Sequence, residues 1–441
     1  MPAEKLNQVY GNFLNKPLDV NNFDQLWVDT DEVRGKRRII NSIKRRLGDN
    51  AEGSMKFLFA GHRGCGKSTE LVRLQREIEN DFLIFNFSVL RELDYLNLNY
   101  IELFITLMEK LFEYIKINEK KISVSKKLLE NIRNWTASKE MEEIRDRYLD
   151  LGIEAGAGIE ASLPFLLNIF SKFRASAKAS SSLKETITRN IEPRLSELIF
   201  NCNSLLTEIK NQLKKINKKG ILLIIEDLDK IDLSRGEDIF YTHSPQLAEL
   251  NCHCIFTFPI ALLYHIRYNT IRNKYDECYC LPMIKVNTRE GRDFKAGIEV
   301  ITDIIRQRMN LDLFDDEKII KKIIKKSGGC LWDIFRMIKD ATDQALDFGR
   351  TVITDEDFQV AYRTLKNDYN HTIAENKEKG IKVEQYYDTL KACAQDKNKK
   401  PPETDILLDL RHNLTILNYN GDDWSDVHPV VKDLLKERGL L

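Results

Sequence analysis

The sequence predicts an α/β fold, in which a parallel-sheet domain with a helical insertion precedes a helical domain and a small C-terminal domain. Short apolar runs alternate with helical segments in the first part of the chain, as expected for a parallel sheet covered by helices. Helical spacing then continues through residues 289–370. A helix at residues 383–394, a second near 403–411 and a hairpin around Asn420-Gly421 predict a C-terminal winged helix.

Composition limits the function classes. The chain has 441 residues, 42% of them hydrophobic, which is enough for several buried cores. Its 68 basic and 68 acidic residues cancel, so no overall attraction to nucleic acid or to an anionic membrane is expected. Eight cysteines do not indicate a disulfide scaffold. Because no signal-peptide pattern and no apolar run of spanning length is present, we expect a cytoplasmic protein without a membrane partner.

The expected sheet is built from short apolar runs. The run at residues 56–60 ends in a glycine-rich turn, and Leu71, Leu74 and Ile78 follow at helical spacing. This segment therefore predicts a strand, a loop and a helix. A helix with a solvated basic face is expected before it, with apolar positions at Ile39, Ile40, Ile43 and Leu47. The remaining strands are predicted at residues 82–87, 221–225, 254–258 and 278–283.

The turn after the first strand matches the phosphate-binding (Walker A) pattern G-x-x-x-x-G-K-[ST] without deviation. Its glycines let the backbone turn N–H groups toward phosphate oxygens, and the helix that starts near Lys67 adds the positive end of its dipole. We expect Lys67 to contact the β- and γ-phosphates and Ser68 to hold magnesium. The strand before the turn and the helix after it argue against a chance match. The expected nucleotide-binding residues are Gly61, His62, Arg63, Gly64, Cys65, Gly66, Lys67, Ser68 and Thr69.

An acidic pair supports this prediction. The apolar run at residues 221–225 ends in Glu226 and Asp227, followed by Leu228 and Asp229. A P-loop NTPase needs one acid near the metal and often another that orients the attacking water. A buried strand delivers both acids at its C-terminal end, where ligands bind in such sheets. Glu226 and Asp227 are therefore candidates for catalysis, and either could hold magnesium with Ser68.

These residues resemble the AAA+/STAND group of P-loop ATPases, near its origin-recognition-like branch. More specifically, the chain is similar over most of its length to prokaryotic ATP-binding proteins that share four motifs. The resemblance implies ATP and Mg²⁺ as ligands, nucleotide-driven switching and frequent self-assembly into an oligomer. The four motifs correspond to His62-Arg63 within the loop, Ile191–Ile199, Glu226–Lys230, and Ser327-Gly328-Gly329.

Three further site residues are implied by this resemblance. Arg34 sits where the class has its N-terminal box beside the adenine. Thr257 ends a strand at the position where a polar sensor residue faces the γ-phosphate, although an ordinary strand-end threonine is the alternative. Arg336 lies on the lid helix. The expected domains are residues 1–50 (lead-in and adenine-side helix), 51–288 (P-loop NTPase domain with a helical insertion at about 100–217), 289–370 (helical lid) and 371–441 (winged helix).

The sequence departs from this class at two positions. The first acid is usually Asp, whereas Glu226 is one methylene longer, so hydrolysis is expected to be slow. The usual lid arginine is replaced by Trp332, and Arg336 lies one turn further along the same helix. A second cation could instead come from Arg267 or Arg272 of a neighbouring subunit, unless these are ordinary surface arginines.

Three other patterns have alternative interpretations. Cys252-His253-Cys254 and Cys278-Tyr279-Cys280 favour buried strand cysteines over zinc, because zinc sites more often use C-x2–4-C spacing. The Gly152–Ser182 stretch is either a flexible insertion or an amphipathic element that places Phe165, Leu166, Ile169 and Phe170 on lipid, the second interpretation being weakened by Pro164. From 383 to 441 the chain carries 8 Lys+Arg and 11 Asp+Glu, so 8 − 11 = −3. This charge disfavours DNA and favours a protein contact or an autoinhibitory role.

Taken together, these patterns favour an ATP-dependent switch that acts through a separate protein effector. Apart from the nucleotide site, the sequence contains no second catalytic constellation that can be assigned, so such a chain needs a partner to act. By analogy only, we expect a setting in prokaryotic antiviral defence. The alternative is a DNA-binding ATPase of loader or initiator type that uses the winged helix.

Overall fold

The structure is a computed structural model. It describes residues 1–18, 22–35, 38–118, 122–136, 163–179, 185, 188–396, 404–419 and 424–441. The predicted hairpin turn at Asn420-Gly421 and most of the glycine-rich part of the Gly152–Ser182 stretch lie outside these residues.

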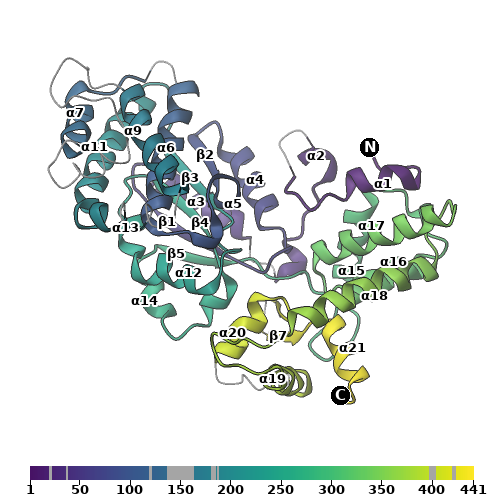
Figure 1. The fold of residues 1–441 in the computed structure, drawn as a ribbon. Helices are drawn as coiled ribbons and strands as arrows, with labels where there is room; N and C mark the ends of the chain where they lie inside the picture. The colour runs from purple at the N-terminus through teal and green to yellow at the C-terminus, as the bar shows by residue number, and fades with distance from the viewer. Residues whose placement is uncertain are drawn as a thin grey trace.

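A five-stranded parallel sheet forms the centre of the NTPase domain, with the order β2-β3-β4-β1-β5 (Figure 1). Its strands therefore end along one edge, which brings the loop after β1 near the acids after β3. The prediction of an α/β P-loop NTPase fold is confirmed. The strand bounds are β1 Lys56–Ala60, β2 Phe82–Ser88, β3 Gly220–Glu226, β4 His253–Phe258 and β5 Glu277–Cys280.

Strand β5 is shorter than the predicted 278–283. Pro282 has no backbone N–H to continue the ladder, and the Met283 N–H instead donates to the Asn418 carbonyl at 3.2 Å. The chain therefore leaves the sheet beside the C-terminal domain.

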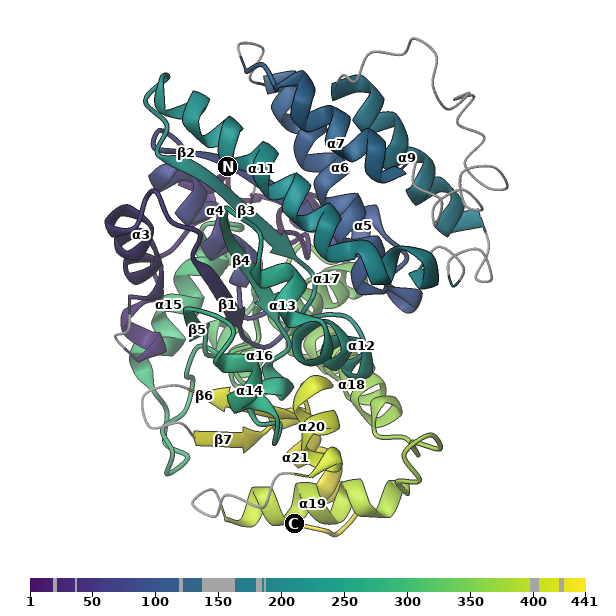
Figure 2. The ribbon, with the colours of Figure 1, turned by 90° about the vertical axis from the view of Figure 1, so that its left-hand side faces the viewer.

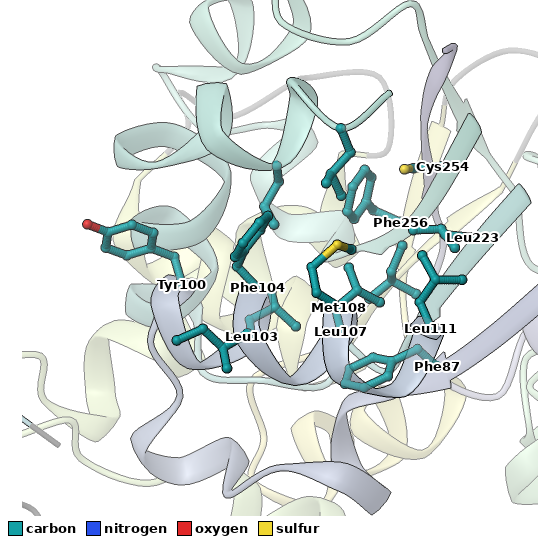
Figure 3. Close-up of a cluster of buried hydrophobic side chains, with 14 of the residues drawn as sticks. Phe87, Tyr100, Leu103, Phe104, Leu107, Met108, Leu111, Leu223, Cys254 and Phe256 are labelled. Atoms are coloured by element: carbon teal, nitrogen blue, oxygen red, sulfur yellow. The ribbon is translucent and has the colours of Figure 1, made fainter. Parts of the chain in front are cut away.

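Helices cover both faces of the sheet. Apolar side chains of α3 (Ile39–Asp49) and α4 (Lys67–Ile78) pack with Phe57, Phe59, Leu222 and Ile224 on one face. On the other face, α6 (Tyr100–Asn118) and α11 (Leu195–Lys214) pack against the alternate residues of the same strands. Figure 3 shows the side chains of α6 lying against Leu223 and Phe256 of the sheet.

The helical insertion stands at one end of the sheet (Figure 2). It contains α6, α7 (Lys126–Thr136), α9 (Leu163–Ala179) and the start of α11. In α9, Ile169 and Phe170 are fully buried in the core that contains α6. The interpretation that placed these two side chains on lipid was therefore wrong, because they complete the protein core. None of the helices in the described ranges is long and apolar enough to cross a bilayer.

The lid is a helical body beside the sheet domain, and it shares one hydrophobic core with the C-terminal domain (Figure 1). The N-terminal helix α1 (Leu6–Asn12) belongs to this core, with Val9 and Phe13 buried among the lid side chains. A residue at the very start of the sequence, Ala3, also exchanges backbone hydrogen bonds with Arg308 and Asn310 at 2.9 and 2.8 Å. The lid helices are α15 Lys295–Arg306, α16 Glu317–Lys326, α17 Leu331–Asp347 and α18 Asp355–Thr372.

The C-terminal domain contains the elements that the winged-helix prediction requires. Two helices precede an antiparallel hairpin, which pairs Ile416 with Val427 and Tyr419 with Trp424, and a last helix follows. The bounds are α19 Val383–Gln395, α20 Asp405–His412, β6 Ile416–Tyr419, β7 Trp424–Val427 and α21 Pro429–Glu437.

Short helices complete the chain. They connect the longer elements and lie at their ends. Their bounds are α2 Phe23–Leu26, α5 Val89–Glu92, α12 Leu233–Glu237, α13 Ser244–Ala248 and α14 Tyr268–Arg272, with 3-10 turns η1 Glu32–Arg34, η2 Tyr95–Asn97, η4 Glu192–Arg194, η6 Ile260–Leu263 and η7 Leu311–Leu313 and a π-helical turn η5 Asp238–Thr242.

Candidate functional site

The predicted phosphate loop turns sharply between β1 and α4. Gly64 and Gly66 have φ values of 72° and 101°, a backbone conformation that strains residues with a Cβ. A Cβ at Gly64 would also lie 2.6 Å from Cβ of Trp332 in the lid helix α17. The loop therefore packs directly against the lid, and glycine is needed both for the turn and for this approach.

Lys67 lies inside the loop. Its ammonium donates to the carbonyls of Gly61 and His62 at 2.8 and 2.9 Å. The same nitrogen lies 2.7 Å from Oδ2 of Asp229, and both side chains are almost fully buried. The ammonium of Lys67 thus lies within the loop, where a carboxylate neutralises it in this structure.

The two predicted acids have different surroundings. Glu226 hydrogen-bonds with the Ser68 hydroxyl, and its pKa is raised, mainly by burial and against the effect of that bond. Asp227 accepts a hydrogen bond from Ser88 and another from Lys230 at 2.6 Å, with φ of 73°. Glu226 and Ser68 together offer the oxygen ligands that Mg²⁺ prefers, so the residues present fit this ion.

Thr257 lies on β4 beside these acids. Its hydroxyl accepts a hydrogen bond from the Leu228 N–H at 3.1 Å and is within hydrogen-bonding reach of Asp229. The predicted sensor position therefore faces the carboxylate that pairs with Lys67. Asp229 was not among the predicted site residues, although it follows the acidic pair at the end of the strand by only two residues and could have been included for that reason.

A cleft opens between the loop, the lid and the N-terminal segment. Its charged wall is the loop with Lys67, Ser68 and Thr69, and apolar side chains, together with Asn15 and Lys16, line the rest. A cleft that combines a phosphate-binding loop with aromatic carbon suits a nucleotide. The apolar wall comprises Leu14, Pro17, Leu331, Trp332 and Phe335.

Sequence reasoning found the charged wall and missed the apolar one. Trp332 was noted only as a missing arginine, yet it is 42% exposed and lines the cleft. Leu14 and Pro17 come from the lead-in, where no motif marks them. A tryptophan three residues after the glycine turn, at the start of the lid helix, was the available signal.

Arg34 lies behind the loop and is 4% exposed. Its guanidinium donates to the Cys65 carbonyl at 2.5 Å, to the Pro282 carbonyl and to the Thr30 hydroxyl at 2.8 Å. Burial lowers its pKa, which nearby acids partly oppose. Arg34 therefore stabilises the loop backbone by hydrogen bonds and does not line the cleft.

The two loop residues that characterise the expected motif contact the C-terminal domain. Nε2 of His62 accepts the N–H of Asn418 in β6 at 2.8 Å. Burial, with the charges of Lys67 and Arg411, lowers the pKa of His62 to about 3, so the ring is neutral. Arg63 lies 3.4 Å from Nε2 of His412 at the end of α20 and donates to the Lys230 carbonyl at 2.8 Å.

The candidate arginines do not reach the cleft within this chain. Arg336 pairs with Asp368 of α18 and lines a neighbouring pocket. Arg272 pairs with Glu277 at 3.0 Å. Arg267 is half exposed, lies 4.6 Å from the Tyr241 ring centroid, and makes only a long contact to a glutamate. Of the three, Arg267 is therefore the one best placed to reach another molecule.

The two cysteine pairs differ in burial, because Cys252 and Cys254 are buried whereas Cys278 and Cys280 on β5 are half-buried. The sulfurs of Cys252 and Cys254 lie 3.9 Å apart and are fully buried, as the shared strand face predicts. No group of three or more His, Cys, Asp or Glu side chains that could hold a metal occurs in the part of the chain that the structure describes. The interpretation as buried strand cysteines accounts for both residues.

Comparison with known proteins finds only distant similarity. No protein-family model and no curated relative matches the sequence. Among solved structures, the chain is similar to the Walker-type ATPase PABY2304 of Pyrococcus abyssi, at 14% identity over 96% of this chain and 99% of that chain, with a TM-score of 0.44. It is also similar to Cdc6p from Pyrobaculum aerophilum (11% identity, 93% and 99% covered, TM-score 0.38) and to the ORC2 protein of Aeropyrum pernix (12%, 96% and 99%, 0.39). Values this low support no statement about function.

Proposed function

We propose that this chain is an ATP-dependent switch that binds Mg²⁺-ATP in the cleft between the phosphate loop and the lid and hydrolyses it slowly. The observation that carries the proposal is the cleft itself. Lys67, Ser68 and the glycine backbone form a phosphate-binding wall, and Trp332 and Phe335 form an apolar wall for the base. The triphosphate of ATP would lie along the loop, and its adenine would lie against the lid.

The acids support hydrolysis as well as binding. Ser68 and Glu226 would hold Mg²⁺, which neutralises charge on the phosphates. Asp227 would orient the attacking water, because its carboxylate is next in sequence and is held by Ser88 and Lys230. We expect slow turnover, since Glu226 is longer than the usual aspartate and Arg336 is directed away from the cleft.

The contact between the loop and the C-terminal domain supports a switch. The Asn418 N–H donates to His62, and the Tyr419 hydroxyl donates to the Gly328 carbonyl at 2.6 Å in the turn before the lid helix. The hairpin therefore touches the phosphate loop and the base of the lid at once. A change in the loop on nucleotide binding would be transmitted to the C-terminal domain, which we propose contacts a protein effector, with self-association and antiviral defence as the setting.

A DNA-binding ATPase of initiator type is the second candidate, and the geometry of α20 disfavours it. This is the helix that would enter a DNA groove. Arg411 is buried in it, with its guanidinium 3.7 Å from the Tyr264 ring centroid, and His412 faces Arg63. The basic side chains of α20 are thus directed into the NTPase domain and are not positioned to contact DNA phosphates.

A comparison of Lys67→Ala with wild type tests the proposal. Removing the main phosphate cation should lower ATP affinity at least tenfold, about 1.4 kcal/mol, by calorimetry, and should abolish phosphate release. Lys44→Ala is a matched control, since Lys44 is an exposed lysine paired with Glu77 on the far side of α4. Equal ATP binding by wild type and Lys67→Ala would refute the site.

A second experiment tests the initiator alternative. Anisotropy of labelled duplex DNA at physiological salt should show no specific binding, and tight binding would favour that alternative.

A further inference from the structure

We propose that the Asp229 carboxylate competes with nucleotide phosphates for the ammonium of Lys67. Asp229 pairs with this ammonium in the nucleotide-free chain, and it pairs with it again when the nucleoside diphosphate leaves. This inference rests on the proposed nucleotide site and adds a residue that controls product release. Asp229 acts through Lys67 and is therefore a positioning residue.

The first step is the coordination of Lys67. An ammonium has three N–H donors. Three oxygens already lie within 2.9 Å of its nitrogen, from Gly61, His62 and Asp229. A phosphate oxygen can therefore reach Lys67 only by replacing one of them. Asp229 is the only one of the three that carries a charge, so it is the partner that an incoming phosphate replaces.

The second step is the energetic strength of this pairing. The ammonium nitrogen of Lys67 and Oδ2 of Asp229 are 2.7 Å apart, and the two side chains are 6% and 3% exposed. Water therefore screens this pair of opposite charges only weakly. Each group therefore stabilises the charged form of the other. An unpaired buried charge is costly, so loss of either partner must be compensated by another group.

The third step is the position of Asp229 after it releases Lys67. Its carboxylate keeps the Thr257 hydroxyl within reach, and the charge of Lys230 also acts on it. Lys230 lies 2.6 Å from Asp227, so it can share its charge between the two acids. Phosphate binding can thus free Asp229 without leaving it unpaired. When a diphosphate leaves, Asp229 supplies the negative charge that pairs with the buried ammonium of Lys67.

The experiment measures ADP without magnesium, in excess chelator, so that metal binding plays no part. Asp229→Asn keeps the size of the side chain and removes its charge. We expect ADP to bind at least tenfold more tightly by calorimetry and a fluorescent ADP analogue to dissociate about tenfold more slowly in a stopped-flow instrument. The nucleotide-free variant should melt at a lower temperature than wild type, and ADP should raise its melting temperature by more.

Two comparisons separate this mechanism from a general effect of charge. Asp232→Asn removes a carboxylate three residues further along the chain, which accepts hydrogen bonds from Ser234 and does not pair with Lys67, and it should change ADP affinity less than threefold. In a Lys67→Ala background, Asp229→Asn should give no further gain. Unchanged or weaker ADP binding by Asp229→Asn, or an equal gain without Lys67, would overturn the proposal. Asp229→Ala replaces Asp229→Asn if the latter does not fold, and absence of ADP binding by wild type would instead reject the nucleotide site itself.

Discussion

Acid should loosen the contact between the phosphate loop and the C-terminal hairpin, because His62 must stay neutral there. The pKa of His62 is lowered from 6.5 to about 3 by burial and by nearby cations. Below pH 6.5 the unfolded chain therefore binds a proton that the folded chain does not bind. Stability consequently falls as the pH falls from 6.5 toward 3, and at pH 5 this one group costs about 2 kcal/mol.

His62→Gln tests this calculation, since its amide oxygen can replace Nε2 as the acceptor for the Asn418 N–H and does not titrate in this range. Urea unfolding at pH 7.5 and pH 5.0 should show that wild type loses about 2 kcal/mol more than the variant. His371→Gln, at an exposed histidine, should behave like wild type. Equal losses in wild type and His62→Gln would refute the reasoning. Hydrogen exchange should place the extra opening at residues 416–419 and in the loop.

Three other outcomes are expected from the geometry of the site. Asp227→Asn should lower the turnover number more than ATP affinity, whereas Glu226→Gln should remove the magnesium dependence of ATP binding; the reverse pattern in steady-state kinetics would exchange their roles. Trp332→Ala should weaken ADP binding about tenfold in calorimetry and leave inorganic triphosphate binding unchanged, because only the base contacts that wall. If Arg267 completes a neighbour's site, activity per subunit should rise with protein concentration and mixed Lys67→Ala and Arg267→Ala subunits should regain activity; constant specific activity over a hundredfold dilution would exclude this.

The elements of this fold were predictable where local pattern determines them. The buried run that ends at Glu226 and the glycine turn before Lys67 each define their structure over a few residues, and both lie where predicted. The ion pair between Lys67 and Asp229 was not predictable, because it depends on the order of strands in the sheet. The contact of His62 with Asn418 joins residues 356 positions apart, and no periodicity records such a contact.

The site residues show the same distinction. Trp332 faces the cleft because the lid folds back over the loop, a tertiary arrangement that the helix pattern of α17 does not contain. Arg34 and Arg336 were assigned by resemblance to positions beside the nucleotide, and those assignments stay predictions. In this structure their guanidinium groups pair with the loop backbone and with Asp368, respectively.

The packing of α1 in the lid has a mechanical consequence. Because α1 packs in the lid and the chain then passes through the sheet domain and returns to the lid at α15, two separate polypeptide connections join these bodies. A body attached at two points rotates most easily about the line between them, so lid movement should reduce to a single hinge axis and resist twisting. Removing α1 would cut one of the two attachments and take Val9 and Phe13, which contacts Phe335, out of the lid core. A bulky protein fused before α1 would therefore be attached to the lid. The sheet domain, which contains the phosphate loop, would stay unchanged.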